Sequence, residues 1–559
     1  MKKLKKGIAL LISLLYVINS CVVPAAASEF YLSGREIVNL ENQVNESAYA
    51  AESTQSTEEF AMGYELDSEG DINAALIEED PEDIYGTLPS SVDLSTSPYF
   101  PSVIGNQGSI GSCCSFASVY YQFTYEANKL NNITSDSNTT IYSPAYVYNV
   151  IAGGQNTGTS YINNYTFLKE FGCVSLEEFP YYSSTSIDDW NDWCTDTEAM
   201  REALSTRLTA YETMQIPVSS TTATITSATD TDLDTVKKYL SLGKVLTVSS
   251  YFQWNVKKGY GTDSSENIAY RCYKSSGSSH AFAIVGYDDT IECDVNGNGT
   301  IEAYERGAFK VVNSWGTKYA IGDGIYSTDG YFWILYDALN TVSANSVNDW
   351  EDDCTGTRCS AFLSNNTFWM IYVENKEVDF VGEFDFTTVN RNKLSLACGV
   401  SKTGLDEPTS TLSVFPKGKM SSSTESDAAY SGKLVFDYSQ TPVNVYYTGY
   451  DWYVRFNTTA SFTKSAFAIT DNLGNVISDF GTLKASTDGA YTSQTISLSK
   501  GDVNYDGSIS VDDALLAQRC YVELEEFSNV QLYLGDMDND GDVDINDSQE
   551  ILRIYVNSQ

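Results

Sequence analysis

The chain has 559 residues, of which 42% are apolar and 13% aromatic, enough to build buried cores in roughly three domains. Its formal net charge is −42, from 75 acidic against 33 basic residues. Such a surface repels phosphate backbones and anionic lipids, so the composition argues against nucleic acid and membrane as partners. It favours a secreted, well-solvated protein whose carboxylates bind calcium.

The first 27 residues have the pattern of a secretory signal peptide. Four lysines stand among the first six residues, an apolar run covers 7–18, and Pro24 precedes three alanines. The apolar run is too short to span a bilayer permanently. We therefore predict cleavage after Ala26 or Ala27 and a mature chain that leaves the cell.

Residues 28–87 form a strongly acidic segment. They include 16 acidic residues and one basic residue, Arg35. Such a segment cannot bury enough apolar surface to fold alone. It is predicted to be a linker or a pro-segment.

The stretch NQGSIGSCCSFA, residues 106–117, places Gln107 six residues before Cys113. An apolar-periodic run follows, which puts Cys113 in the first turn of a buried helix. There the helix dipole and the unpaired backbone N–H groups favour the thiolate over the thiol. Cys113 is the predicted nucleophile.

The chain contains one histidine, His280, at the start of the strand-like run AFAIVGYD, and Asn313-Ser314-Trp315-Gly316 follows downstream. An asparagine oxygen can accept the imidazole N–H and fix its tautomer, so that the other nitrogen faces a thiol. Trp315 would shield that hydrogen bond from water. A single histidine excludes a zinc site built on paired histidines.

In this order and spacing, the three motifs resemble those of papain-like cysteine peptidases. The resemblance implies an α+β fold at 88–345, with a helical half and a β-barrel-like half. It also implies that Gln107 supplies the oxyanion hole and that Cys113, His280 and Asn313 form the catalytic site. Two positions depart from the family: Ile110 replaces a disulfide-bonded cysteine, and Cys114 replaces the aromatic residue after the nucleophile.

Other segments extend the resemblance. LPSSVD at 88–93 resembles the start of the mature peptidase, and residues 234–248 are predicted as a helix followed by a buried strand. Gly153 and Gly154 stand where a bare backbone would pair with a peptide substrate, although a simple turn explains them equally well. These glycines and Trp315 are the predicted substrate-binding residues. The helical inhibitory prodomain of such zymogens has no matching pattern in 28–87, so the resemblance does not extend to inhibition by that segment, whose role is not predicted.

An insertion at about 288–307 has the spacing D-x-N-x-N-G with a later acid, typical of a calcium loop. An acidic hairpin turn is the alternative, because the loop connects two strands rather than two helices. The candidate ligands are Asp294, Asn296, Asn298, Thr300 and Glu305.

Residues 346–498 contain alternating apolar runs separated by turn residues, which predict an antiparallel β-sandwich. The runs are 368–373, 379–386, 433–438 and 452–456. Exposed aromatics there could bind carbohydrate or protein, but packing explains them more simply.

The segment 499–559 repeats itself at an offset of 34, GDVNYDGSISVDD at 501–513 and GDMDNDGDVDIND at 535–547. The duplicated loops, each followed by a helical pattern, resemble a dockerin: a small α-helical module with paired EF-hand-like loops that binds a cohesin of a cellulosome scaffold. The resemblance implies two calcium ions, besides one in the insertion. The predicted calcium ligands are Asp502, Asn504, Asp506, Ser508 and Asp513 in the first loop and Asp536, Asp538, Asp540, Asp542 and Asp547 in the second. The predicted cohesin contacts are Val511, Asp512, Ile545 and Asn546.

The sequence thus predicts a multidomain, secreted, cellulosome-associated cysteine endopeptidase at the cell surface. Its partners would be a peptide or protein substrate and a cohesin. The alternative is a catalytically inactive papain-like module that serves as a scaffold-attached binding protein, because Cys114 replaces an aromatic neighbour of the nucleophile. The preferred substrate residue is not predicted.

Overall fold

The structure is a computed structural model that describes residues 62–65, 67–75, 87–154, 156–183, 190–215, 230–251, 254–272, 279–339, 367–414, 430–440 and 450–559. These residues belong to one compact unit, Thr57–Gln559. The predicted signal peptide and most of the acidic segment lie outside the described residues. Within the described ranges, every helix is too short or too polar to cross a lipid bilayer.

The helices of the region 88–345 begin at the predicted nucleophile. Three consecutive helices cover 113–131 without a break, the middle one of π type, and Asn132 ends the run in the left-handed conformation at φ 54°. Ser143 and Ser160 cap the next two helices by accepting a hydrogen bond from a backbone N–H, as expected of N-cap serines. The helices are α4 (Cys113–Ser115), η3 (Phe116–Phe123), α5 (Thr124–Asn131), α6 (Pro144–Ile151), α7 (Tyr161–Phe171), α9 (Thr197–Ala203) and α10 (Asp230–Ser241).

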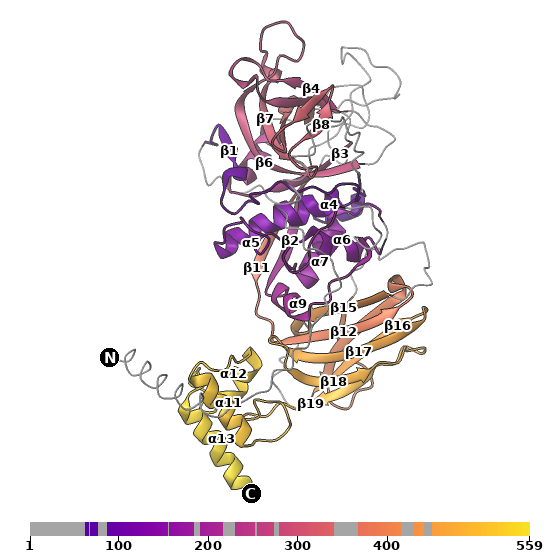
Figure 1. Ribbon diagram of the computed structural model, residues 1–559, viewed down its shortest axis with the longest axis vertical. Coiled ribbons are helices and arrows are strands. Elements are labelled where there is room, and N and C mark those ends of the chain that lie inside the picture. The colour runs from indigo at the N-terminus through magenta and orange to yellow at the C-terminus, as the bar shows by residue number, and fades with distance from the viewer. Residues whose placement is uncertain are drawn as a thin grey trace, which may run out of the picture. The chain divides into compact units, whose positions relative to one another are not determined.

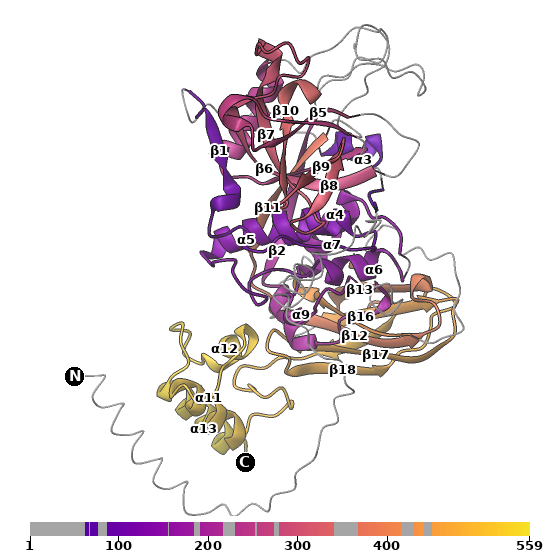
Figure 2. The same ribbon diagram turned by 45° about the horizontal axis from the view of Figure 1, so that its top comes forward.

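A nine-stranded sheet forms the other part of this region, in the order β2-β11-β3-β6-β7-β10-β5-β4, with β1 paired to β6. Helices α4 to α7 gather beside β2 and β11, while β7 lies farther from them (Figures 1 and 2). The strands are β1 (Ser91–Asp93), β2 (Thr206–Gln215), β3 (Leu246–Tyr251), β4 (Trp254–Lys258), β5 (Asn267–Cys272), β6 (Ser279–Glu292), β7 (Arg306–Val312), β10 (Tyr331–Leu335) and β11 (Thr367–Asn375). A separate two-stranded sheet pairs β8 (Tyr319–Gly322) with β9 (Ile325–Ser327).

The first residues of β6 are buried without interruption, Ser279 to Tyr287. Such a run is typical of a strand covered on both faces. Since β3 and β7 flank β6 in the sheet, His280 lies in a central strand. This position holds the imidazole rigidly at the boundary between helices and sheet.

Part of the acidic segment is ordered. Helix α3 (Glu69–Ala74), labelled in Figure 2, is capped by Ser68. The backbone N–H of Thr213 donates to Ala75 O at 2.7 Å, and Ile72 is 1% exposed. The segment therefore packs on β2 although its composition could not form a core alone.

The predicted boundary at 346 is wrong for one strand. The run 368–373 is a strand, as predicted, but β11 pairs with β2 and β3 in the nine-stranded sheet. The reason is physical: residues 368–371 are apolar and buried without alternation, and such a run specifies a buried strand but not which partner it pairs with. The chain therefore leaves the nine-stranded sheet after Asn375.

The remaining predicted runs form two four-stranded antiparallel sheets, with orders β15-β12-β17-β18 and β14-β13-β16-β19. Rings from the two sheets meet between them, such as Phe384 and Phe456 with centroids 5.3 Å apart. The strands are β12 (Phe380–Thr388), β13 (Leu394–Lys402), β14 (Ser410–Ser413), β15 (Tyr430–Asp437), β16 (Tyr450–Thr458), β17 (Phe462–Asp471), β18 (Val476–Thr482) and β19 (Thr492–Ile496).

Three helices follow in the C-terminal part: α11 (Val511–Tyr521), α12 (Asn529–Gly535) and α13 (Ile545–Ser558). α11 and α13 begin at equivalent positions of the two repeated loops, 34 residues apart. Both start with a capping box, at Ser510 and at Asp544. The repeat in the sequence is therefore also a repeat in backbone structure.

Candidate active site and metal loops

Cys113 begins the helical run α4–η3–α5. Its predecessor Ser112 has a non-helical backbone, and the N–H of Phe116 donates to the carbonyl of Ser112 at 3.0 Å. The first-turn N–H groups of a helix lack intrahelical partners, so the thiol stands where such groups gather. The side chain of Cys113 is 0% exposed.

His280 and Asn313 are brought together from two neighbouring strands. The His280 Nε2 lies 2.7 Å from Asn313 Oδ1, and the rings of His280 and Trp315 have centroids 4.5 Å apart. Asn313 is itself fixed, because its Oδ1 accepts from Ser314 N at 2.7 Å and its carbonyl accepts from the Tyr121 hydroxyl at 2.8 Å. Since an amide oxygen only accepts, this contact places the imidazole proton on Nε2 and turns Nδ1 to the opposite side.

Gln107 is buried beside the same loop. Its Oε1 accepts from the Ser314 hydroxyl at 2.6 Å, and its Nε2 donates to Ile110 O at 2.8 Å. The Gln107 N–H also donates to Ser314 O at 2.8 Å. The glutamine is thus tied to the residue that follows Asn313, which joins the two halves of the candidate site.

Residues 62–65 cross directly over this site. Tyr64 N donates to Ser279 O at 3.1 Å on one side, while Thr159 N donates to Gly63 O and Glu65 N donates to Thr159 O, both at 2.9 Å, on the other. A Cβ at Gly63 would lie 2.0 Å from the carbonyl oxygen of Gly111, two residues before the nucleophile. Gly63 therefore lets the segment approach the turn before Cys113 more closely than a residue with a side chain could.

This burial controls the ionisation of both reactive groups. Burial raises the pKa of Cys113 to about 11, although hydrogen bonds from the backbone N–H groups of Ala281 and Gly63 act in the opposite direction. Burial lowers the pKa of His280 to about 4, against the hydrogen bond to Asn313, which raises it. Both shifts favour the neutral form, because a charge without water around it is costly. In the covered state the pair is a thiol and a neutral imidazole.

The predicted substrate-pairing glycines lie elsewhere. Gly153 and Gly154 form the turn after α6, with φ of 63° and 80°, and a Cβ at Gly154 would meet Asn191 Oδ1 at 2.3 Å. The backbone that pairs with a crossing segment is that of Thr159. Two adjacent glycines are equally consistent with a tight turn and with a close backbone approach. In this structure they form a turn.

Cys114 is buried among residues of the helices and near the covering segment, with Asp67 and Glu65 among its electrostatic neighbours. It is 0% exposed, and Asn164 Nδ2 lies 3.6 Å from its sulfur. Burial and the neighbouring Cys113 both raise its pKa. Burial affects both thiols alike, so what keeps Cys113 as the candidate is its contact with the backbone N–H of Ala281, the residue after His280.

The insertion between β6 and β7 closes around Asp294. Its carboxylate accepts from the backbone N–H groups of residues 297, 298 and 299 at 2.7–3.1 Å, and Glu305 accepts from Val295 N at 2.8 Å. Glu302, which the sequence analysis missed, contacts the side-chain amide of Asn298 at 2.8 Å; it occupies the ninth loop position, often a calcium-ligand position. The Thr300 N–H donates to Asn298 Oδ1 at 2.7 Å. One turn thus contains all the predicted ligands, Asp294, Asn296, Asn298, Thr300 and Glu305.

The first C-terminal loop winds around its two end carboxylates. Asp502 accepts from Gly507 N at 3.0 Å, and Asp513 accepts from Val503 N and Asn504 N at 3.0 and 3.2 Å. Asp502 is 3% exposed, and its buried Oδ1 has no protein hydrogen-bond partner among the described residues. A buried carboxylate oxygen with no donor fits a site for a cation. The other predicted ligands of this loop, Asp506 and Ser508, lie on its exposed rim.

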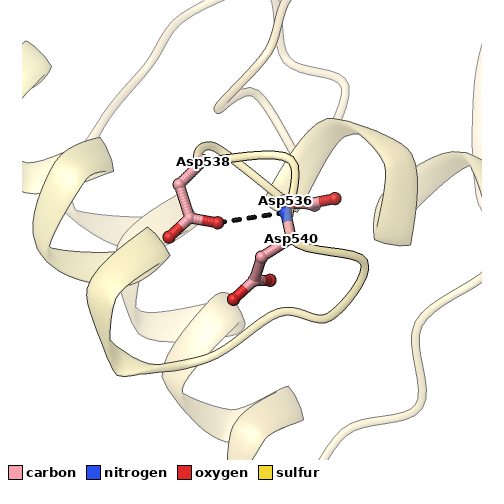
Figure 3. A group of neighbouring side chains, drawn as sticks. All are labelled: Asp536, Asp538 and Asp540. Carbon is pink, nitrogen blue, oxygen red and sulfur yellow. Dashed lines mark hydrogen bonds between the residues drawn. The ribbon is translucent and has the colours of Figure 1, made fainter.

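The second C-terminal loop repeats the arrangement with more carboxylates. Asp547 accepts from Met537 N at 2.6 Å, as Asp513 does from Val503. Carboxylate oxygens of Asp536, Asp538 and Asp540 lie within 4.8 Å of one another, and Figure 3 shows them around one turn. A second group within the same limit contains Asp542, Asp544 and Asp547. Asp544 was missed, because in the first repeat the same position is Ser510.

The four predicted cohesin contacts begin the two equivalent helices. Val511 is 50% and Ile545 is 38% exposed. Asp512 and Asn546 are exposed beside them. Two apolar side chains on equivalent helix starts are thus available to a partner.

Comparisons with known proteins give distant structural likenesses. No family model matches the chain, and no curated protein matches it. The chain is similar to xylellain, a cysteine protease from Xylella fastidiosa, at 18% identity and a TM-score of 0.35, over 57% of this chain and 98% of that one. It is similar to procathepsin B from Trypanosoma congolense at 15% identity and a TM-score of 0.34, over 56% and 87%. A cysteine protease allergen of ragweed pollen in its proform gives 14% identity and a TM-score of 0.30, over 52% and 67%. Because these likenesses are so distant, we argue the function from this chain's own residues.

Proposed function

We propose that the chain is a secreted cysteine endopeptidase with Cys113 as nucleophile. The observation that carries the proposal is the His280–Asn313 pair under the Trp315 ring, with Nε2 fixed at 2.7 Å from Oδ1. An imidazole held in one tautomer, beside a thiol at a helix start, is the arrangement that nucleophilic acyl transfer needs. The sulfur's contact with the N–H of Ala281, the residue after His280, supports their proximity.

The proposed reaction moves one proton back and forth. His280 Nδ1 takes the thiol proton as the sulfur attacks the peptide carbonyl carbon, and the carbonyl oxygen becomes an oxyanion. The backbone N–H of Cys113 and the second amide hydrogen of Gln107 would stabilise that charge. His280 then protonates the leaving amine as the C–N bond breaks. Water, deprotonated by His280, finally splits the thioester and restores the thiol.

Residues 62–65 and 67–75 act in this proposal as an inhibitory segment. They occupy the place where a substrate would pair, between Thr159 and Ser279. They present to the sulfur the N–H of Gly63 rather than a carbonyl carbon, so the thiol has nothing to attack. The sequence alone left this segment as a linker or a pro-segment and gave no pattern for inhibition.

The rest of the chain serves attachment in the same proposal. The two four-stranded sheets form a β-sandwich accessory domain, and the C-terminal repeat is a dockerin that binds a cohesin of a cellulosome-type scaffold. Calcium would neutralise the facing carboxylates of each loop. The orphaned Oδ1 of Asp502 and the acidic groups around Asp536 support two such sites, and the insertion around Asp294 is a third candidate.

The test is peptide hydrolysis by the full chain after the covering segment is displaced. Cleavage of a denatured protein that is lost in Cys113→Ala supports the proposal. A chain with the segment displaced and the thiol accessible, yet without hydrolysis of any protein or peptide in a diverse set, would favour the inactive binding module. Binding to a panel of cohesins, with calcium and with chelator, tests the attachment separately.

A further inference from the structure

We infer that Tyr121 is a positioning residue of the proposed peptidase. Its buried hydroxyl holds the backbone of Asn313 in place, and through Asn313 it fixes the orientation of His280. The inference rests on the proposed function and adds to it a residue that touches neither the substrate nor the reacting atoms. Tyr121 lies on η3, in the helical run that begins at Cys113.

The Tyr121 hydroxyl joins two backbone groups from distant parts of the chain. It donates to the carbonyl of Asn313 at 2.8 Å and accepts from the N–H of Gly105 at 3.0 Å. Both directions are settled, because a carbonyl only accepts and an N–H only donates. Tyr121 is 1% exposed, Asn313 is 0% exposed, and Gly105 is buried. Without the hydroxyl, a buried acceptor and a buried donor would each lose a partner, which is costly.

These two backbone groups border a short ladder that joins parts of the candidate site. Residues 105–107 pair with residues 314–316 through two backbone hydrogen bonds of 2.8 and 2.9 Å. Gln107 belongs to the first stretch, and Asn313 directly precedes the second. Because Tyr121 comes from the helical run that starts at the nucleophile, one hydroxyl links that run to both stretches.

The Tyr121 ring is itself held by other rings. It stacks on Phe100, with centroids 5.6 Å apart and planes 4° apart, and meets Tyr120 edge to face at 5.1 Å. Burial, and to a lesser extent the neighbouring Tyr120, raises the pKa of Tyr121 well above its usual value. The hydroxyl therefore keeps its proton at neutral pH and donates to Asn313 throughout the working range.

The contact reaches the imidazole through Asn313. The hydroxyl fixes the carbonyl of Asn313, and the side-chain oxygen of the same residue lies 2.7 Å from His280 Nε2. A misplacement of about 1 Å in such an arrangement can cost about 100-fold in rate. The backbone groups proposed to pair with a substrate are those of Thr159 and Ser279, which Tyr121 does not hold. Loss of the hydroxyl should therefore lower kcat and leave KM nearly unchanged.

The experiment compares Tyr121→Phe with Tyr120→Phe in the full chain carrying Gly63→Leu, whose side chain cannot fit beside Gly111 and so displaces the segment. Tyr120 is the matched control: it is also 1% exposed, and its hydroxyl donates to a backbone carbonyl, that of Val103, at 3.0 Å. We expect Tyr121→Phe to lower kcat about 10- to 100-fold with KM within about twofold. Tyr120→Phe should change kcat little, because its hydroxyl bonds outside the site.

The imidazole signal separates positioning from a general loss of stability. His280 is the single histidine of the chain, so isotope-labelled histidine reports on this ring alone by nuclear magnetic resonance. The signal of the Nε2 proton should shift or broaden in Tyr121→Phe and stay in place in Tyr120→Phe. This measurement uses the covered chain, which keeps the contacts of the segment, so it remains available should the doubly substituted chain fold poorly.

Two further variants test the route through Asn313. In an Asn313→Ala background, Tyr121→Phe should lower kcat no further, because the two residues act as one unit. Replacing Tyr121 by p-aminophenylalanine, which keeps an N–H donor at the same place, should restore most of the lost kcat.

Equal kcat values for Tyr121→Phe and Tyr120→Phe, or an unmoved imidazole signal, would overturn the inference and leave the peptidase function standing. A full additional loss of kcat in the Asn313→Ala background would do the same. No hydrolysis by the chain carrying Gly63→Leu alone, with Cys113 open to alkylation, would overturn the proposed function itself and the inference with it.

Discussion

Replacing Gly63 by leucine should expose and ionise Cys113. In the covered chain the pKa of Cys113 is raised to about 11, so at pH 7 about one thiol in 10⁴ is thiolate. A cysteine in water has a pKa of about 8.5, or about one thiolate in 30 at pH 7. Displacement of the segment thus raises the thiolate fraction roughly 300-fold. A thiolate becomes less nucleophilic as its pKa falls, with a Brønsted slope of about 0.4–0.5. The expected gain in alkylation rate is therefore about 20-fold, before any gain from better access to the sulfur.

The assay is the rate of iodoacetamide alkylation at Cys113, measured by peptide mapping. The Cys114→Ala background removes the adjacent thiol, so that alkylation of this peptide reports on Cys113. Gly70→Ala is the matched control, because a Cβ there meets only Ser68 Oγ at 3.9 Å. The sign with pH follows from a raised pKa: the covered chain should gain about tenfold in rate per pH unit up to pH 10, whereas Gly63→Leu should level off near pH 8.5 or below. Equal rates for the Gly63→Leu and covered chains would refute the reasoning, as would an equal acceleration by Gly70→Ala.

Four further outcomes are expected. Cys113→Ala should abolish hydrolysis by several orders of magnitude while Cys114→Ala keeps most of it, and the reverse would move the nucleophile by one position. Asn313→Ala should lower kcat about 10- to 1,000-fold with a smaller change in KM, because it frees the imidazole without removing it; an unchanged kcat measured on the displaced chain would contradict the tautomer argument. Chelation should lower the thermal midpoint of the peptidase transition, and Glu305→Gln should reduce that calcium effect; an unchanged midpoint with no bound calcium by metal analysis would remove the insertion site. Cohesin binding should need calcium and weaken at least tenfold in Asp513→Ala, as titration calorimetry would measure; tight binding in chelator, or no cohesin bound, would count against the dockerin proposal.

The candidate site was accessible from the sequence because its signals are local. Gln107 and Cys113 are only six residues apart, and His280 stands out because it is the single histidine of the chain. The structure brings His280 beside Asn313 because β6 and β7 are neighbours, which two buried runs separated by a loop already favour. The repeated loops, each followed by a helical pattern, likewise predicted the helices α11 and α13.

What the sequence did not predict depends on partners far away in the chain. Gly63 is one glycine in an acidic stretch, and only its contact with Gly111 gives it a role. The run at 368–373 is a continuous apolar stretch typical of a buried strand, and its pairing with β2 is a choice of partner that such a stretch does not encode. The identity of Thr159 gives no signal in the sequence, because it pairs with the segment through its backbone N–H and C=O groups, which do not depend on the side chain. Glu302 and Asp544 were passed over because the ninth loop position tolerates many residue types.

The most direct measurement is the site of modification by a thiol-reactive peptide epoxide on the full chain. Such a reagent needs both a peptide-binding cleft and an activated thiol. We expect one adduct, on Cys113, forming faster in Gly63→Leu than in the Gly70→Ala control and absent in the Cys113→Ala chain. An adduct on Cys114 in place of Cys113, or no adduct in the displaced chain under conditions where iodoacetamide reaches Cys113, would contradict the account.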